Sequence, residues 1–145
     1  MNVRVLQRLL GALRAVHWSH WTSHWQVKGM PFYGDHLMFE RMYTAVAQEI
    51  DTLAEKIVAD FGPDAVEPLA QIAETHNILD DLRASGPVAR GLLAEELVQT
   101  ALKGAYDALK KEGCMSLGMD DFLMATANAH DTHLYLLRQR ARSKS

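Results

Sequence analysis

The chain has 145 residues, 48% of them hydrophobic, with a formal net charge of −3 and a pI near 6.1. This length and apolar content suit a single domain, residues 1–145, with one substantial core. The acidic balance gives no general nucleic-acid-binding surface, and no apolar run reaches the roughly 18 residues of a membrane span. The single cysteine, Cys114, excludes an intramolecular disulfide framework and fits a reducing, cytoplasmic compartment.

Apolar residues recur at helical spacing along most of the chain, and strand-like alternation is almost absent, so the sequence predicts an all-α fold. The first predicted helix covers residues 3–27. The second carries apolar residues from Phe39 to Ile57 with no interrupting Gly or Pro. Gly-Pro pairs at 62–63 and 86–87 then bound a short helix, and two longer helices follow. The predicted ranges of these last three helices are 66–82, 88–111 and 119–142.

The second predicted helix carries four potential metal ligands on one stripe. At about 100° per residue around the helix axis, with His36 at zero, Glu40 falls at about 40°, Asp51 at about 60° and Glu55 at about 100°. Imidazole and carboxylate ligands together suit iron, zinc or manganese. At about 1.5 Å rise per residue, His36 and Asp51 lie roughly 22 Å apart along the axis, so one ion cannot touch both. An antiparallel copy related by a two-fold axis would bring His36 and Glu40 of one chain to Asp51 and Glu55 of the other. The spacing therefore predicts a dimer with two equivalent intersubunit metal sites.

A family pattern runs through and around this stripe. Its residues are His24-Trp25, Val27-Lys28-Gly29, Phe32, His36, Phe39-Glu40, Tyr43, Asp51 and Ala54-Glu55-Lys56, with spacings of 12, 4, 11 and 4 between the potential ligands. In residue types and spacings this pattern resembles the Dps family, the dodecameric mini-ferritins that protect bacterial DNA in starvation and oxidative stress. One departure is Glu40, where the family more often has Asp; the longer side chain keeps the charge but can move the metal or change its denticity.

The resemblance implies a ferritin-like four-helix bundle with a short extra helix between the second and third bundle helices. It also implies that His24, His36 and Glu40 of one subunit bind iron together with Asp51 and Glu55 of its two-fold mate. Fe(II) would be oxidised to Fe(III) at this di-iron or mono-iron site, with hydrogen peroxide preferred to oxygen, and ferric mineral would be stored in a dodecameric cage. The protein would then be a ferroxidase. Zinc or manganese stay open as substitutes, because sequence does not choose the metal.

The first 34 residues contain neither Asp nor Glu. A ferritin-type di-iron site inside one four-helix bundle takes Glu from helices that include the first. Since the first helix here cannot supply that carboxylate, the residues by themselves favour the intersubunit arrangement.

Four more histidines form a candidate second metal site. His130 and His133 share a face of the last helix, and either His17 or His20 could join them from the first. The alternative for His17 and His20 is a hydrogen-bonded histidine in the core or at an interface.

Both ends of the last helix carry charge. Asp120 and Asp121 at its start either stabilise the positive end of the helix dipole or, as the resemblance implies, line pores through which iron enters a cage. Residues 138–145 form a basic C-terminal tail. The resemblance implies DNA binding through such a tail, with nucleoid association, because twelve copies would multiply weak phosphate contacts. The alternative is that part of the tail continues the last helix, where cations suit the negative end of the helix dipole. An alternative function is a non-enzymatic DNA-compacting cage protein with weak or absent ferroxidase activity. The tail's cations are Arg138, Arg140, Arg142 and Lys144.

Overall fold

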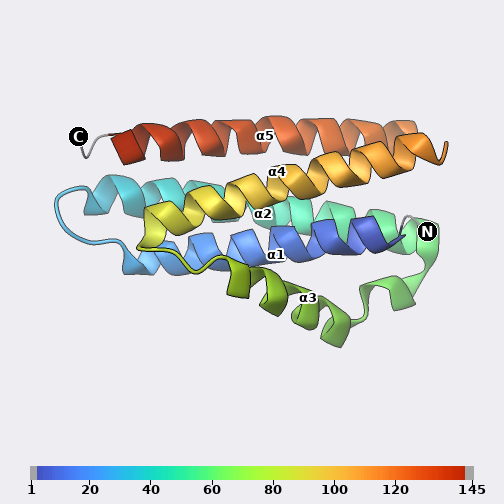
Figure 1. Cartoon of the computed structure of the whole chain (residues 1–145), viewed down its shortest axis with the longest axis horizontal. Helices are drawn as coiled ribbons and strands as arrows, with labels where there is room; N and C mark the ends of the chain where they lie inside the picture. Colours follow the sequence, from blue (N-terminus) through green and yellow to red (C-terminus); the bar gives the residue numbers. More distant parts are fainter. Residues whose placement is uncertain (1–2, 143–145) are drawn as a thin grey trace.

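The computed structural model describes residues 3–142, and within that range the chain is built from helices alone (Figure 1). The all-α prediction is therefore confirmed. The elements in chain order are α1 (Val3–Gln26), α2 (Phe32–Phe61), a short 3-10 helix η1 (Pro63–Val66), α3 (Pro68–Asp81), α4 (Pro87–Lys111) and α5 (Leu117–Arg142).

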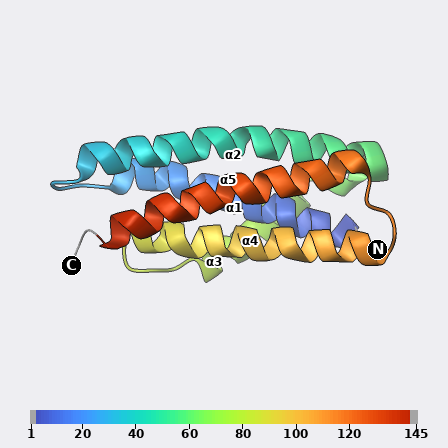
Figure 2. The ribbon, with the colours of Figure 1, turned by 90° about the horizontal axis from the view of Figure 1, so that it is seen from above.

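Four long helices form a bundle, and the short helix α3 lies outside it. α1 contacts both α2 and α4, and α5 closes the bundle by contacting the same two helices. Figure 2 shows α5 running between α2 and α4, with α1 on the far side. α3 packs across α1, below the bundle in Figure 1. This is the predicted four-helix bundle with an extra helix between the second and third long helices.

Local chemistry explains where the helices end. Gly62 and Gly86 adopt φ values of 91° and 89°, a region that favours glycine, and each is followed by a proline that starts the next helix. The Ser116 hydroxyl accepts a hydrogen bond from the Met119 backbone N–H at 3.0 Å and caps α5. These signals are readable in sequence, so the predicted helix bounds lie close to the observed ones.

α2 is longer than its predicted apolar range of 39–57, since it begins at Phe32 and ends at Phe61. The first turn was missed because its apolar side chains do not face the core: Phe32, Tyr33 and Leu37 are exposed. Their exposure removes the buried stripe on which periodicity analysis depends.

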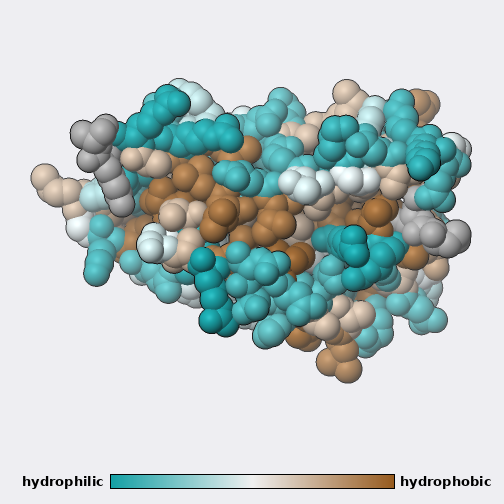
Figure 3. Space-filling model, viewed as in Figure 1, coloured by the Kyte–Doolittle hydropathy of each residue, from teal (hydrophilic) through white to brown (hydrophobic). Residues whose placement is uncertain are grey.

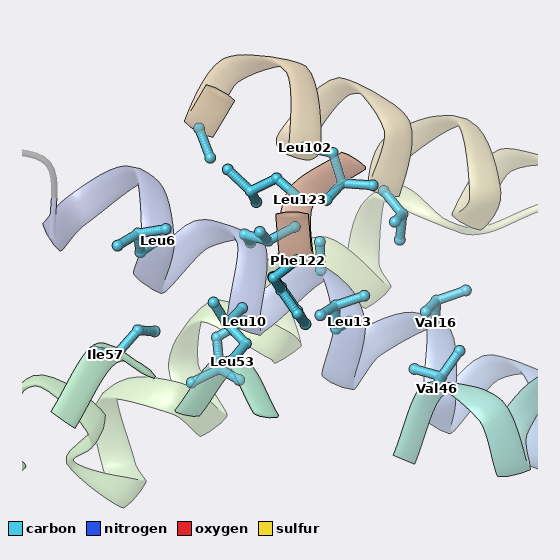
Figure 4. Packing of buried hydrophobic residues seen from close by; sticks show 14 of the residues in the cluster. Leu6, Leu10, Leu13, Val16, Val46, Leu53, Ile57, Leu102, Phe122 and Leu123 are labelled. Atoms are coloured by element: carbon cyan, nitrogen blue, oxygen red, sulfur yellow. The ribbon is translucent and has the colours of Figure 1, made fainter. Parts of the chain in front are cut away.

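The core consists of two apolar clusters. The larger one joins α1, α2, α4 and α5 through leucines, valines and Phe122, as Figure 4 shows for Leu6, Leu10, Leu13 and Leu53 among others. The smaller one contains Val27, Phe39, Met42 and Leu137. In α1 and α5 the residues between the two clusters include buried histidines, so the bundle has a polar layer within its core.

None of the described helices is both long enough and apolar enough to cross a membrane.

Candidate metal centres

The turn between α1 and α2 brings His24 and His36 together. The Nδ1 atom of His24 donates to the backbone carbonyl of His36 at 2.7 Å, and Nδ1 of His36 donates to the carbonyl of His24 at 2.6 Å. The two rings stack with centroids 3.6 Å apart, and the Phe32 ring stacks on His36 at 5.0 Å. His24 is buried and His36 half-buried. The pair is thus a rigid unit within one chain.

This reciprocal bonding fixes the tautomer of both rings. A carbonyl oxygen only accepts, so each Nδ1 must carry the proton, and the lone pair of each neutral ring lies on Nε2. A metal-binding histidine commonly donates its other ring N–H to a backbone carbonyl in this way, which orients the ring and raises its basicity as a ligand. Both histidines are therefore prepared to bind a metal through Nε2.

Glu40, Asp51 and Glu55 are exposed along α2. Within residues 3–142, one group of three potential ligands has all its ligand atoms within 4.8 Å of one another. That group lies elsewhere in the bundle, and His24, His36 and Glu40 do not form such a group. The rise of α2 keeps Asp51 and Glu55 more than about 20 Å along the axis from His36, so a single chain holds two separate halves of the predicted site. We call His24, His36, Glu40, Asp51 and Glu55 the outer set.

A second group of histidines and carboxylates lies in the middle of the bundle. Glu95 Oε2 is 2.8 Å from His20 Nε2 and 3.3 Å from His133 Nδ1, and Glu95 Oε1 is 2.6 Å from His130 Nδ1. The other nitrogen of His130 is 2.7 Å from Glu49 Oε1. We call these five residues, which come from α1, α2, α4 and α5, the inner cluster. The side chains of His20, Glu95 and His130 are fully shielded from solvent, and those of His133 and Glu49 are 5% and 13% exposed.

Hydrogen bonding sets the ionisation of the inner cluster. Burial opposes the charge on Glu95, but hydrogen bonds from His130, His133 and His20 outweigh it and hold the pKa of that carboxyl far below its usual range. Burial likewise opposes the charge on His130, but hydrogen bonds to Glu49 and Glu95 raise its pKa to about 9. For His20 burial dominates and lowers the pKa, despite the hydrogen bond to Glu95. The metal-free cluster therefore holds Glu95 as a carboxylate and His130 as an imidazolium.

The inner cluster overlaps the predicted second metal site but differs from it in membership. His20 lies with His130 and His133, whereas His17 lies outside, half-buried, with its ring at 5.6 Å from Trp21 and 6.0 Å from Tyr43. Burial lowers the pKa of His17 as well. The sequence leaves two alternatives for His17 and His20, core hydrogen bonding or metal binding. In the structure His20 makes a buried hydrogen bond within a group of potential ligands.

Glu49 and Glu95 are not among the site residues predicted from the sequence. Each stands on the apolar stripe of its helix: Glu95 lies between the buried residues Ala94 and Val98, and Glu49 lies three residues after Val46. A carboxylate at a core position needs a partner inside the protein. That signal, together with the two histidines of α5, could have identified the inner cluster.

The charged ends of α5 fall where the sequence predicted. Asp121 is exposed and Asp120 half-buried, and Asp120 Oδ1 has no hydrogen-bond partner among the described residues. Arg138, Arg140 and Arg142 belong to the last turns of α5, so at least this part of the predicted tail is helical. Arg140 is tied to α2, because its Nε donates to Asp35 Oδ1 at 2.7 Å. Lys144 lies outside the described residues.

The fold and its metal-ligand groups define the class of protein. The structure of Dps from Thermosynechococcus elongatus has a TM-score of 0.82 and 20% identity, covering 97% of this chain and 89% of that chain. The Dps protein of Vibrio cholerae O1, a member of a broad superfamily of ferritin-like diiron-carboxylate proteins, has a TM-score of 0.80 and 14% identity, covering 97% and 88%. At these identities the likeness shows the fold alone, and that fold is the ferritin-like helical bundle.

Sequence similarity narrows this class to a family. The chain is 30% identical over 121 residues to DNA protection during starvation protein 2 of Bacillus anthracis, covering 79% of each. No protein-family model matches the chain. The identity and coverage to this curated relative show that the chain belongs to the Dps family.

Proposed function

We propose that this protein is a mini-ferritin that oxidises Fe(II) at sites shared between two subunits and stores the ferric product in a dodecameric cage. The observation that carries the proposal is the His24–His36 pair, which presents two Nε2 lone pairs at one end of the α2 stripe of carboxylates. Membership of the Dps family and the ferritin-like fold support it.

Two-fold symmetry would complete the site. An antiparallel α2 from a second subunit would bring Asp51 and Glu55 to the histidine pair and Glu40, and the same rotation would form an identical site at the other end. All three carboxylates are exposed in the single chain, which leaves them available to a partner.

Exposed apolar side chains support association between subunits. Trp25, next to the ligand His24, is 63% exposed, and Trp18 and Tyr33 are 64% and 72% exposed. On α3, Leu69 and Ile72 are 73% and 63% exposed. Figure 3 shows a further band of hydrophobic residues across the middle of one face, bordered by hydrophilic ones. Apolar surface of this extent is typical of subunit interfaces.

Iron is the substrate in this proposal. Two Fe(II) ions would each give one electron to hydrogen peroxide, whose O–O bond breaks to yield water, and hydrolysis of the Fe(III) would deposit a ferric oxyhydroxide and release protons. Histidine nitrogen suits Fe(II), while the harder carboxylate oxygens favour Fe(III) as it forms. The mixed outer set can therefore both bind the ferrous ion and promote its oxidation. Consuming iron and peroxide together would protect DNA.

Stopped-flow oxidation of Fe(II) by peroxide and by oxygen tests the proposal, on protein whose particle mass is checked by light scattering. We expect a particle near twelve subunits with fast peroxide-dependent oxidation, and a variant with both His36→Ala and Asp51→Ala that assembles but loses at least about 100-fold in rate. The matched control replaces the exposed His76 and Asp60, which lie off the ligand stripe, with alanine and should keep the wild-type rate. A correctly assembled double variant with an unchanged rate would refute the outer set as the reaction site.

Direct DNA binding is a second candidate function, favoured by the exposed Arg138 and Arg142 at the end of α5 and by the name of the B. anthracis relative. Gel shifts across a salt series, with residues 138–145 intact or removed, test it. Binding that is lost on truncation, and that weakens steeply with salt, would support contact through phosphate charge. Unchanged binding after truncation would assign it to another surface.

A further inference from the structure

We propose that the inner cluster binds one divalent first-row transition metal ion inside each subunit, through His20, Glu95 and His133, and that Zn²⁺ is the best match. This site is complete within one chain. It does not depend on the proposed iron oxidation at the outer set.

The three ligand atoms are already close to coordination geometry. His20 Nε2 and His133 Nδ1 converge on the same carboxylate oxygen, Glu95 Oε2, at 2.8 and 3.3 Å, and all three atoms lie within 4.8 Å of one another. Ligands about 2.0–2.2 Å from a tetrahedral ion are separated by roughly 3.3–3.6 Å. The His133–Glu95 contact already has this separation, the His20–Glu95 contact needs to open by about 0.5 Å, and the two nitrogen atoms lie no more than 4.8 Å apart.

The remaining two residues of the inner cluster orient Glu95. His130 holds Glu95 Oε1 through Nδ1 and is itself held by Glu49 through Nε2. These two hydrogen bonds in series fix the carboxylate plane of Glu95 and direct its Oε2 toward the two other histidines. Hydrogen-bonded partners behind the ligands are a regular part of metal sites and affect affinity strongly. His130 and Glu49 would therefore act as positioning residues that do not touch the ion.

A purely structural hydrogen-bond network accounts less well for His20. Its Nδ1 is buried and has no hydrogen-bond partner among the described residues, although a buried polar atom of this kind is costly. An ion would add a coordinate bond at Nε2 of the same ring, and its positive charge would interact favourably with the buried Glu95 carboxylate.

The ligand types select the ion. Carboxylate-rich di-iron bundles use Glu from two helices and Glu-x-x-His from the other two. Here α1 supplies a histidine and α5 supplies His130-x-x-His133, so nitrogen replaces carboxylate on two helices. Two imidazoles and one carboxylate form a ligand set well known for Zn²⁺, and affinity for such donors is higher for Zn²⁺ than for Fe²⁺.

The test uses the assembled full-length chain carrying His36→Ala and Glu55→Ala, which removes ligands from the outer set. After loading with Zn²⁺ and desalting, we expect one zinc per subunit by elemental analysis, and Co²⁺ should give the intense visible bands of a tetrahedral nitrogen-oxygen site. Adding Glu95→Gln, or separately His133→Ala, should remove both the zinc and the bands. His17→Ala is the matched control, because His17 is a histidine of the same helix outside the inner cluster, and it should retain both.

Two further readouts separate a ligand from a structural residue. His130→Gln should keep one zinc per subunit while weakening affinity about 10- to 100-fold, as expected for an orienting residue. Zn²⁺ should raise the melting temperature of the outer-set variant and leave that of its Glu95→Gln derivative unchanged. The proposal is overturned if the folded outer-set variant retains no zinc, or if zinc remains bound after both Glu95→Gln and His133→Ala. Neither result would bear on iron oxidation by the wild-type protein.

Discussion

The outer set and the inner cluster use the same side-chain types in opposite surroundings. The carboxylates of the outer set are exposed, belong to no close group of three potential ligands within residues 3–142, and lie on one long helix. Those of the inner cluster are almost fully buried and are bonded to histidines from other helices. In our proposal a second subunit completes the outer set, whereas the inner cluster lies within one folded chain.

The comparison shows that the same types of ligand side chain place different demands on the fold. An exposed carboxylate is solvated whether or not a metal is present, so its presence places little demand on the fold. A buried one must be paired, so removing one partner from the inner cluster should cost stability. Substitutions should therefore separate the two groups, with activity lost at one and stability lost at the other.

Subunit complementation should give the largest effect, because it tests whether the outer set is shared. His36→Ala alone and Glu55→Ala alone should each reduce the rate of iron oxidation at least about 100-fold, since every site loses a ligand. In co-expressed mixtures half of the dimers are mixed, and one of their two sites regains all its ligands, so about one quarter of the wild-type rate should return. The rate is measured by stopped flow on co-assembled particles. Mixtures as inactive as their parents would place all ligands on one chain.

Removal of a buried carboxylate should cost stability. Glu95→Ala leaves three buried histidines without their shared acceptor and should lower the free energy of unfolding by about 3–5 kcal/mol. Glu55→Ala on the exposed stripe should change it by less than about 0.5 kcal/mol. Urea unfolding of metal-free protein at constant subunit concentration compares the two. Similar losses for both substitutions would contradict the distinction between the two regions.

The inner cluster should also make stability depend on pH. The pKa of His130 rises from 6.5 to about 9 on folding, so its stabilisation is fully present below about pH 6.5 and is lost as the pH rises through 9. The full loss corresponds to about 3 kcal/mol. Unfolding of chelator-treated protein from pH 6.5 to 9.5 measures it. His130→Gln should flatten this dependence, and a variant with the wild-type slope would assign the effect to another group.

A smaller effect is expected near the outer set. The bond from Arg140 to Asp35 ties the end of α5 to the first turn of α2, one residue before His36, and both side chains are largely buried. Asp35→Asn should lower the free energy of unfolding by about 1–2 kcal/mol, because the ion pair is lost and the guanidinium then donates only to a neutral amide oxygen. Thermal unfolding detects this loss. The exposed pair Lys103–Asp107 is the control, and Asp107→Asn should cost no more than about 0.5 kcal/mol.

Sequence by itself determined the helices and the stripe of the outer set. Helical periodicity, Gly-Pro breaks and the relative angles of His36, Glu40, Asp51 and Glu55 depend only on the local geometry of one helix, which repeats every 3.6 residues or so. The incompleteness of the outer set within one chain follows from the same geometry. For this reason the predicted bundle and its extra helix agree with the structure, except where the exposed first turn of α2 gave no apolar signal.

Only the tertiary structure decided which buried polar residues meet. His20 and Glu95 are 75 positions apart, and His130 and Glu49 are 81 apart, so no spacing rule within a helix relates them. Their contacts depend on the rotation and stagger of four helices, which the packing of the two apolar clusters sets. The same packing turns His20 inward and leaves His17 against Trp21, although both stand on the same helix. Sequence could name the histidines, but the partnership of Glu49 and Glu95 with them arises only when the core closes.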